Sequence, residues 1–362
     1  MQNWVVGLFR QIIGLLATTS LIISPLTSSA SLPGNEDFSN ERIVPLLISP
    51  DSNQSDGSGF LYSSRIVFTS AHTAFSFNDR GELVDTFRYD LSVGKPNSNL
   101  AEAGNGVRVV KRFMAPGYVA DREGDVNDFA VLVLEKDLLK IGPAKLMTPE
   151  IERELVEKRA SVTLHGYGMY VDACSAGQQP PCRIARQDTS QVPRSAPATL
   201  RPAKDFPELV GYALRPKIAE QLLFFSPGKT GMCAGDSGGS LTTIHNGELT
   251  YLSVIGTGDR TYGCGLGGGY DGRGGVQFSP PIYRYLDLIK KAEAFVAEQV
   301  AAEAAAAKLA SDAKAEAEAK AKAEADARAT AASKKSITCV KGKQIKKVSG
   351  PNPKCPKGYK KK

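Results

Sequence analysis

Three polar side chains that lie far apart along the chain are of the types that together catalyse acyl transfer. His72, Asp128 and Ser237 stand in the segments TSAHT, NDFAVLVL and GDSGGSL. A serine hydroxyl is a weak nucleophile unless a neighbouring base accepts its proton. An imidazole suits that role, and a buried carboxylate beside the imidazole fixes its tautomer and stabilises its charged form. The three residues therefore predict a catalytic triad.

Glycines surround the serine of this predicted triad. Gly235 precedes Ser237 by two residues, and Gly238 and Gly239 follow it. Glycine allows a sharp backbone turn and leaves room for a substrate. It also lets the amides of Gly235 and Ser237 point together at a developing oxyanion, where one lost donor costs on the order of 10² to 10³ in rate. We expect these two amides to form an oxyanion hole.

The elements that must position these residues are short strands. Between residues 41 and 279, β-rich runs separated by turn residues recur about every ten residues, which is typical of an all-β sandwich or barrel. The segment 149–158 has a helical pattern and could bridge two halves. The runs are 43–49, 59–62, 65–69, 106–113, 129–134, 160–165, 250–256 and 276–278.

The order His72, Asp128, Ser237, at separations of 56 and 109 residues, resembles the chymotrypsin/trypsin family of serine endopeptidases. Gly166-Tyr167-Gly168 is similar to a stretch early in that family's second barrel. The resemblance covers residues 43–297. It implies two antiparallel β-barrels, at about 43–148 and 159–280, with the active site between them. It also implies a C-terminal helix over 283–297 and protein or peptide substrates.

The resemblance also indicates a specificity pocket. Gly231 stands six residues before Ser237, where trypsin-like members place an aspartate, so a preference for Arg or Lys is not expected. The glycines leave the pocket open, which favours apolar or aromatic P1 residues, although Asp259 or Asp271 could alter its charge. The other residues implied to line it are Gly256, Thr257, Gly258 and Gly275.

Two features depart from the family pattern. Thr73 stands where a cysteine usually follows the histidine, so one family disulfide is absent. Family zymogens are commonly cut before an Ile-Val-Gly-Gly start, whose new amine pairs with the residue before the serine, here Asp236. Ile43 and Val44 match half of that start, but Pro45 follows. Ile43 is either a new N-terminus or simply part of the first strand.

The N-terminal residues have the pattern of a signal peptide. An apolar stretch over residues 12–23 is followed by small residues near Ala30, where a peptidase could cut. The stretch is shorter than the roughly 20 residues that a membrane span requires, although a retained anchor is the alternative. We expect a signal peptide over 1–30, an N-terminal or pro segment over 31–42, and an exported protein without a membrane span.

Export makes disulfides plausible for the six cysteines. Six cysteines allow 15 pairings, and the spacing alone does not choose among them. We favour the local set, in which the resemblance independently implies that Cys233–Cys264 staples the pocket; free thiols are the alternative. The favoured pairs are Cys174–Cys182, Cys233–Cys264 and Cys339–Cys355.

Beyond the protease-like region the composition changes twice. Residues 292–332 contain 21 alanines without glycine or proline, which predicts a helical linker over 298–335. An alanine-packed oligomerising helix is the alternative. The tail over 336–362 has two β-like runs beside a Ser-Gly-Pro-Asn-Pro turn, with one cysteine on each side of the turn. It resembles short Cys-paired basic modules that end many secreted proteins of Gram-positive bacteria. A disordered solubilising tail is the alternative.

The distribution of charge along the chain limits the classes of binding partner that we expect. The net charge is +7, but the last 30 residues hold eleven lysines and no acid, which leaves −4 on the rest of the chain. A basic nucleic-acid-binding domain is therefore not expected. The tail instead suits an anionic cell-wall polymer, which would hold the secreted protein at the cell surface. With only three histidines, no metal site is predicted, and no cofactor is expected.

These patterns favour a secreted serine endopeptidase that acts through an acyl-enzyme. An esterase could use the same triad. A catalytically weak, protease-like surface protein attached through the basic tail is the binding alternative, although no triad residue is missing.

Overall fold

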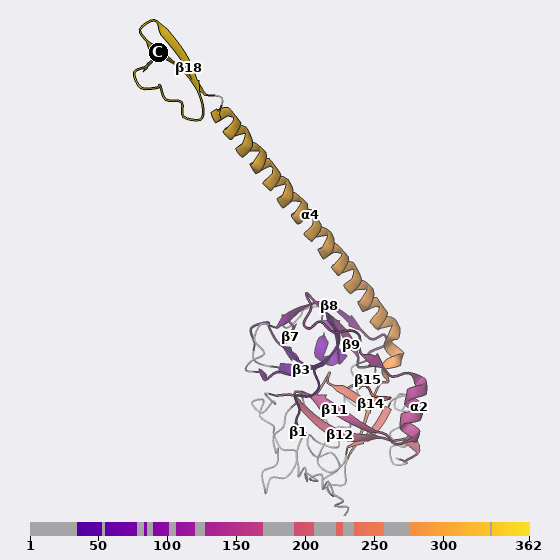
Figure 1. Cartoon of the computed structure of the whole chain (residues 1–362). Helices are drawn as coiled ribbons and strands as arrows, with labels where there is room; N and C mark the ends of the chain where they lie inside the picture. Colours follow the sequence, from indigo (N-terminus) through magenta and orange to yellow (C-terminus); the bar gives the residue numbers. More distant parts are fainter. Residues whose placement is uncertain are drawn as a thin grey trace, which may run out of the picture.

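The computed structural model describes the chain from residue 35 onward, with gaps. Figure 1 shows a body of two β-sheets, a long helix that projects from it, and a small sheet at the far end of the helix. The predicted signal peptide lies outside the described residues. The described residues are 35–52, 55–77, 83–84, 90–100, 106–119, 127–168, 192–205, 222–226, 235–256, 275–333 and 335–362.

The first half of the body is a closed barrel whose strand order is β2-β3-β4-β9-β8-β7. A one-turn helix, α1, spans Ala71–Ala74, and a short hairpin pairs β5 (Ser76–Phe77) with β6 (Leu83–Val84). The barrel strands are β2 (Ile43–Leu47), β3 (Ser55–Ser63), β4 (Ile66–Thr69), β7 (Ser92–Val93), β8 (Val107–Met114) and β9 (Ala130–Leu134).

The second half is an eight-stranded sheet of order β10-β15-β14-β11-β12-β13-β16, with β1 (Asn35–Glu36) also paired to β12. Helix α2 (Pro149–Glu157) lies between β10 and β11, which both belong to this sheet, so the expectation that this segment bridges the two halves is wrong. Its N-terminal amide at Ile151 donates to the Thr148 hydroxyl. The strands are β10 (Lys145–Leu146), β11 (Ser161–Gly166), β12 (Arg194–Leu200), β13 (Leu222–Ser226), β14 (Ser240–His245), β15 (Glu248–Val254) and β16 (Gly275–Ser279).

The expectation of two closed barrels is therefore confirmed only in part, because the second sheet is open within the described residues. Its ends approach each other through an isolated bridge between Ser253 and Pro281 and a hydrogen bond from the Ser279 hydroxyl to the Val254 carbonyl. A regular ladder cannot continue there, because Pro280 and Pro281 have no amide hydrogen to donate.

The side chains of β9 alternate between two apolar cores, and this alternation explains how the barrel packs against the second sheet. In β9 every residue is buried, but Ala130, Leu132 and Leu134 face the barrel interior while Val131 and Val133 belong to the core shared with the second half. A strand whose two faces are both buried reads as a continuous apolar run.

An aromatic cluster fills the junction between the two halves and the C-terminal helix. Phe68 lies 5.3 Å from Phe129 and 5.3 Å from Tyr251 between ring centroids, and Phe60 lies 4.5 Å from Tyr251. Tyr285, which precedes the helix, stacks on Phe129 at 4.6 Å. The residues that flank the candidate site are thus held by a packed apolar junction.

Helix α4 spans Leu286–Ser333 and follows a 3₁₀ turn at Ile282–Tyr285. Because the body also contains α2, the all-β description is confirmed only in part. The helix packs on the barrel further than residue 297. Arg65 binds both oxygens of Glu303 at 2.7 and 2.9 Å and also binds Asp137 at 2.7 Å. Residues 304–331 of the helix are exposed, and the helical segment 304–333 extends about 45 Å at 1.5 Å per residue.

The segment 35–42, expected to be an N-terminal or pro segment, contacts both halves. Strand β1 pairs with β12, and the Asp37 amide donates to the Pro193 carbonyl at 2.9 Å. The Arg42 guanidinium donates to the carbonyls of Leu61 and Tyr62 at 3.0 and 2.8 Å. Ile43 itself begins β2, in agreement with the reading of Ile43 as part of the first strand.

Burial of His165 in β11 makes stability depend on pH. Burial lowers the pKa of His165 to about 4, and the Asp37 carboxylate opposes that shift only in part. The unfolded chain therefore binds more protons than the folded one between pH 6.5 and 4, and the free energy of unfolding should fall by about 2 to 3 kcal/mol across that window. Urea unfolding at a series of pH values measures it. The His165→Gln variant should flatten the dependence; an unchanged slope would contradict this assignment.

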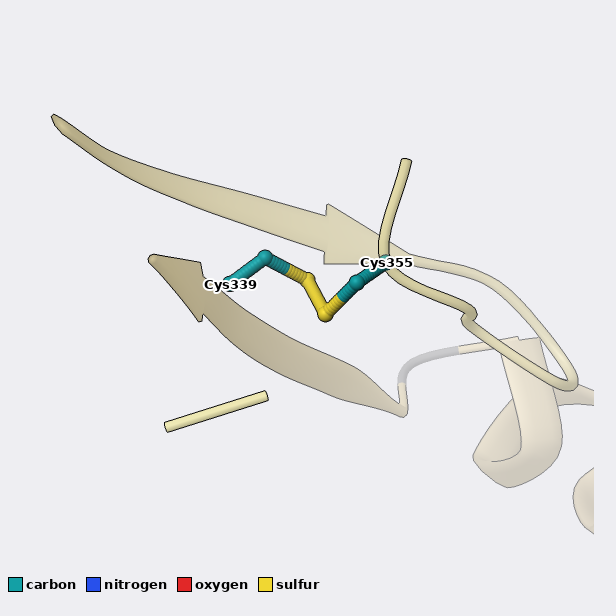
Figure 2. Close-up of a disulfide and its surroundings, with 2 residues drawn as sticks. All are labelled: Cys339 and Cys355. Atoms are coloured by element: carbon teal, nitrogen blue, oxygen red, sulfur yellow. A yellow bond between two sulfur atoms is a disulfide. The ribbon is translucent and has the colours of Figure 1, made fainter. Parts of the chain in front are cut away.

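The tail forms a three-stranded sheet of order β18-β17-β19, and Cys339 and Cys355 are joined as predicted (Figure 2). Its strands are β17 (Ser336–Lys341), β18 (Gln344–Ser349) and β19 (Lys360–Lys361). Such a small sheet has almost no core, so the staple supplies much of its stability. Among the described residues, no helix is long and apolar enough to cross a membrane.

Candidate active site

His72 and Asp128 lie side by side in the first barrel. The His72 Nδ1 is 2.7 Å from Asp128 Oδ2, and the His72 backbone amide donates to Asp128 Oδ1 at 3.0 Å. Asp128 is 1% exposed, whereas His72 is half-buried. Because a carboxylate oxygen accepts hydrogen bonds, Nδ1 carries the proton and Nε2 is the unprotonated ring nitrogen. The imidazole is thus in the tautomer that a general base needs.

Local structure explains this placement. Strand β4 ends at Thr69, and the single turn of α1 then carries His72 beyond the barrel. On the other side, Asn127 has a positive φ of 53°, which turns the chain so that Asp128 points inward before β9 begins. The Asn127 side chain donates to the Gly117 carbonyl at 3.2 Å and accepts from the Tyr285 hydroxyl at 3.3 Å. Burial raises the pKa of Tyr285, so its hydroxyl remains a donor.

Ser237 comes from the second sheet, in the turn before β14, and its backbone contacts the barrel. The Ser58 amide in β3 donates to the Ser237 carbonyl at 2.8 Å. A Cβ added at Gly57 would meet the side chain of Thr73 and lie 3.0 Å from the Ser237 carbonyl. The turn that carries Ser237 and the helix that carries His72 therefore flank the same glycine.

The end of β15 connects the serine turn with Asp128. The Gly238 amide donates to the Ile255 carbonyl at 2.7 Å, and the Ile255 amide donates to the Gly239 carbonyl at 2.8 Å. A Cβ on the next residue, Gly256, would lie 3.1 Å from Asp128 Oδ2. The serine turn of the second half and Asp128 of the first half thus both lie against residues 255 and 256, directly after the end of β15.

Asp236 has a clear structural partner. Its Oδ1 accepts a hydrogen bond from the Gly168 amide at 2.8 Å, and its carboxylate covers Gly166 and Gly168 so closely that neither could carry a side chain. This contact accounts for the Gly-Tyr-Gly stretch. It also shows that the carboxylate is bound by a backbone amide while the chain ahead of Ile43 is intact.

Thr73 stands where the family that the sequence resembles usually has a cysteine. Its hydroxyl forms a hydrogen bond with the Ser70 hydroxyl, with 2.6 Å between the two oxygens. Sequence reasoning missed Ser58 and Thr69, although both are fully buried polar residues beside the serine turn. The signal that could have identified Ser58 is its position between two glycines, since adjacent glycines in a strand indicate a close approach of another backbone.

Part of the predicted site lies outside the described residues. Gly256 and Gly275 are described, and Gly275 begins β16. The oxyanion-hole residues Gly235 and Ser237 lie in the described turn, where Gly235 has φ +90°. Among the described residues, no three His, Cys, Asp or Glu side chains gather as a metal site. The predicted positions outside the described residues are Gly231, Thr257, Gly258, Cys174, Cys182, Cys233 and Cys264.

The sequence was also compared with known proteins. A family model described as Trypsin matches residues 40–277, which include His72, Asp128 and Ser237. No curated protein matches the chain at a significant level. Because the family match covers well over half of the sequence, the chain belongs to the trypsin family and is a serine endopeptidase of the chymotrypsin/trypsin type.

Proposed function

We propose that this protease cleaves peptide bonds with Ser237 as nucleophile, His72 as general base and acid, and Asp128 as the group that orients the imidazole. The observation that carries the proposal is the 2.7 Å bond between His72 Nδ1 and the buried Asp128 carboxylate. This bond places the imidazole proton on Nδ1, so that Nε2 is the nitrogen that accepts a proton in the reaction. The contact between the Ser237 carbonyl and β3 supports the same assignment, since it brings the serine turn to the barrel that carries the other two residues.

The proposed reaction has two symmetrical halves. Ser237 Oγ forms a bond to the scissile carbonyl carbon while its proton passes to His72 Nε2, and the carbonyl electron pair moves onto oxygen. The amides of Gly235 and Ser237 stabilise that oxyanion. The C–N bond then breaks, and Nε2 gives its proton to the leaving amine. Water repeats the sequence on the acyl-enzyme and releases the carboxylic acid.

Cleavage of a peptide library tests both this mechanism and the pocket. The glycines proposed to line the pocket leave it open, so we propose a preference for Phe, Tyr, Leu or similar P1 residues. The Ser237→Ala variant is the matched control and should cleave nothing. Dominant cleavage after Arg or Lys would overturn the pocket assignment alone, whereas equal cleavage by Ser237→Ala would overturn the triad.

We also propose that the protein is exported and that its mature form retains residues 35–42. The support is the pairing of β1 with β12 and the hydrogen bonds of Arg42, which tie this segment to both halves. Sequencing the N-terminus of the active enzyme should therefore find a start before residue 36. A start at Ile43 would contradict this proposal and favour activation by a new amine at Asp236.

The tail is proposed to bind an anionic polymer such as one rich in phosphodiesters. In β17, Cys339 faces Lys346 and Lys361, while Thr338 faces Lys347 and Val340 faces Lys360. Residues directly opposite share a face and successive residues alternate, so lysines project from both faces of the sheet. Charge on both faces is better suited to a flexible anionic polymer, which can wrap around the module, than to a flat anionic surface.

Retention of the full-length protein on immobilised inorganic polyphosphate tests this binding. Replacing Lys346, Lys347, Lys360 and Lys361 with Gln should lower the salt concentration needed for elution, because fewer phosphates are neutralised. The matched control makes the same change in charge on the exposed helix, at Lys308, Lys314, Lys320 and Lys322. Equal elution of the two variants would contradict a specific role for the tail.

A further inference from the structure

Ser58 lies in the middle of β3, between Gly57 and Gly59, and its side chain is completely buried. It makes hydrogen bonds to three separate parts of the candidate site. We infer that Ser58 is a positioning residue that fixes the backbone of the nucleophile turn. The inference rests on the proposed role of Ser237 and deepens it.

The backbone of Ser58 joins two catalytic segments. Its amide donates to the Ser237 carbonyl at 2.8 Å, and its carbonyl accepts from the Thr69 hydroxyl at 2.9 Å. Thr69 is three residues before His72, so one residue of β3 contacts the segments that carry the base and the nucleophile. These bonds do not depend on the Ser58 side chain and would survive its truncation.

The hydroxyl of Ser58 makes two further bonds. It donates to the Gly235 carbonyl at 2.9 Å and accepts from the Tyr167 amide at 2.8 Å. A serine hydroxyl has one proton, so the bond to Gly235 uses its entire donor capacity. The side chain thereby links the nucleophile turn to the Gly-Tyr-Gly stretch at the end of β11. Gly168 of the same stretch binds the Asp236 carboxylate at 2.8 Å.

The Gly235 carbonyl is well placed to control the oxyanion hole. Two carbonyls lie between the Gly235 and Ser237 amides, those of Gly235 and Asp236. The Asp236 carbonyl accepts from the Gly239 amide at 2.8 Å, and the Gly235 carbonyl accepts from Ser58. With both carbonyls bound, neither intervening peptide can rotate without breaking a hydrogen bond. Gly235, at φ +90°, has little steric restraint of its own.

Loss of the Ser58 hydroxyl should therefore affect the transition state more than substrate binding. In the Ser58→Ala variant the Gly235 carbonyl loses its donor, and the turn gains freedom next to the proposed oxyanion amides. Removal of a whole oxyanion donor costs on the order of 10² to 10³ in rate, so partial misalignment should lower kcat by about 30-fold. KM should change less than about threefold, because ground-state contacts are retained.

The experiment compares Ser58→Ala with Ser240→Ala in the full-length protein. Ser240 is also a fully buried serine, in β14, but its hydroxyl has no hydrogen-bond partner within the described residues. We expect kcat to fall only in Ser58→Ala and amide exchange at Gly238 and Gly239 to rise at least tenfold. Ser58→Thr keeps the hydroxyl and should recover kcat to within about fivefold of the wild type.

The two readouts separate this inference from the proposed function. If amide exchange at Gly238 and Gly239 is faster in Ser58→Ala than in the wild type, but the wild-type protein is inactive, the positioning role is upheld and the proposed triad is overturned. Unchanged kcat and unchanged exchange in Ser58→Ala would overturn the positioning role. If Ser58→Ala does not fold, Ser58→Thr decides: a 30-fold loss of kcat with the hydroxyl present would contradict the inference.

Discussion

The Asp128→Asn variant is expected to fold and to lose about 10⁴-fold in kcat. Asp128 is buried, and its two oxygens accept hydrogen bonds from the backbone amide and Nδ1 of His72. In asparagine one oxygen becomes an NH₂ group. If the remaining oxygen keeps the backbone amide, the NH₂ group donates to Nδ1 and forces the imidazole proton onto Nε2. The imidazole then cannot accept the proton of Ser237.

Steady-state hydrolysis of a chromogenic peptide measures this loss. The matched control is Asp205→Asn, because Asp205 is also largely buried and binds Arg159 and Arg201 at 2.9 Å, away from the candidate site. The control should retain kcat. A folded Asp128→Asn protein with kcat within tenfold of the wild type would contradict the proposed role of the carboxylate.

Replacement of Gly238 by alanine should remove most activity and destabilise the fold. Gly238 has φ +84°, and a Cβ there would overlap the Thr69 hydroxyl and the Ser58 carbonyl. The left-handed conformation costs about 1 to 2 kcal/mol for alanine, and overpacking adds about 1 to 3 kcal/mol. Since a displacement of about 1 Å near the chemistry can cost 10²-fold, we expect kcat/KM to fall at least that far.

Gly247→Ala separates the two effects. Gly247 has nearly the same conformation, φ +81°, in the turn between β14 and β15, but within the described part of the chain no atom beyond its two neighbours lies within 4 Å of its added Cβ. This control should show only the conformational cost, about 1 to 2 kcal/mol, with normal kcat/KM. Chemical denaturation and kinetics of both variants measure the difference. Equal losses in the two variants would show that the turn does not pack against β3 and β4 as described.

The sequence predicted the local elements of the body better than their closure. The apolar run at 129–134 corresponds to β9, and the helical pattern at 149–158 corresponds to α2, because periodicity and capping residues act over short distances. Whether the second sheet closes depends on Pro280 and Pro281 meeting the end of β15, a contact between residues about 27 positions apart. No local pattern reports such a contact.

The extent of the packing between the C-terminal helix and the barrel is also set by a contact between residues far apart in the sequence. The alanine-rich composition predicted a long helix, and α4 continues without interruption to Ser333. Its docking on the barrel continues to Glu303 because Arg65, in the turn between β3 and β4 more than 230 residues earlier, supplies the partner. The order of His72, Asp128 and Ser237 identified the family, whereas Ser58 became visible only through its bonds to Gly235 and Tyr167.

Covalent labelling with an organophosphonate tests the central claim most directly. The full-length protein is incubated with the probe, digested and sequenced by mass spectrometry. We predict a single adduct on the Ser237 side chain, loss of peptidase activity in proportion to labelling, and no adduct in His72→Ala. Active protein that remains unlabelled at Ser237, or that is inactivated through another residue, would contradict the proposed mechanism.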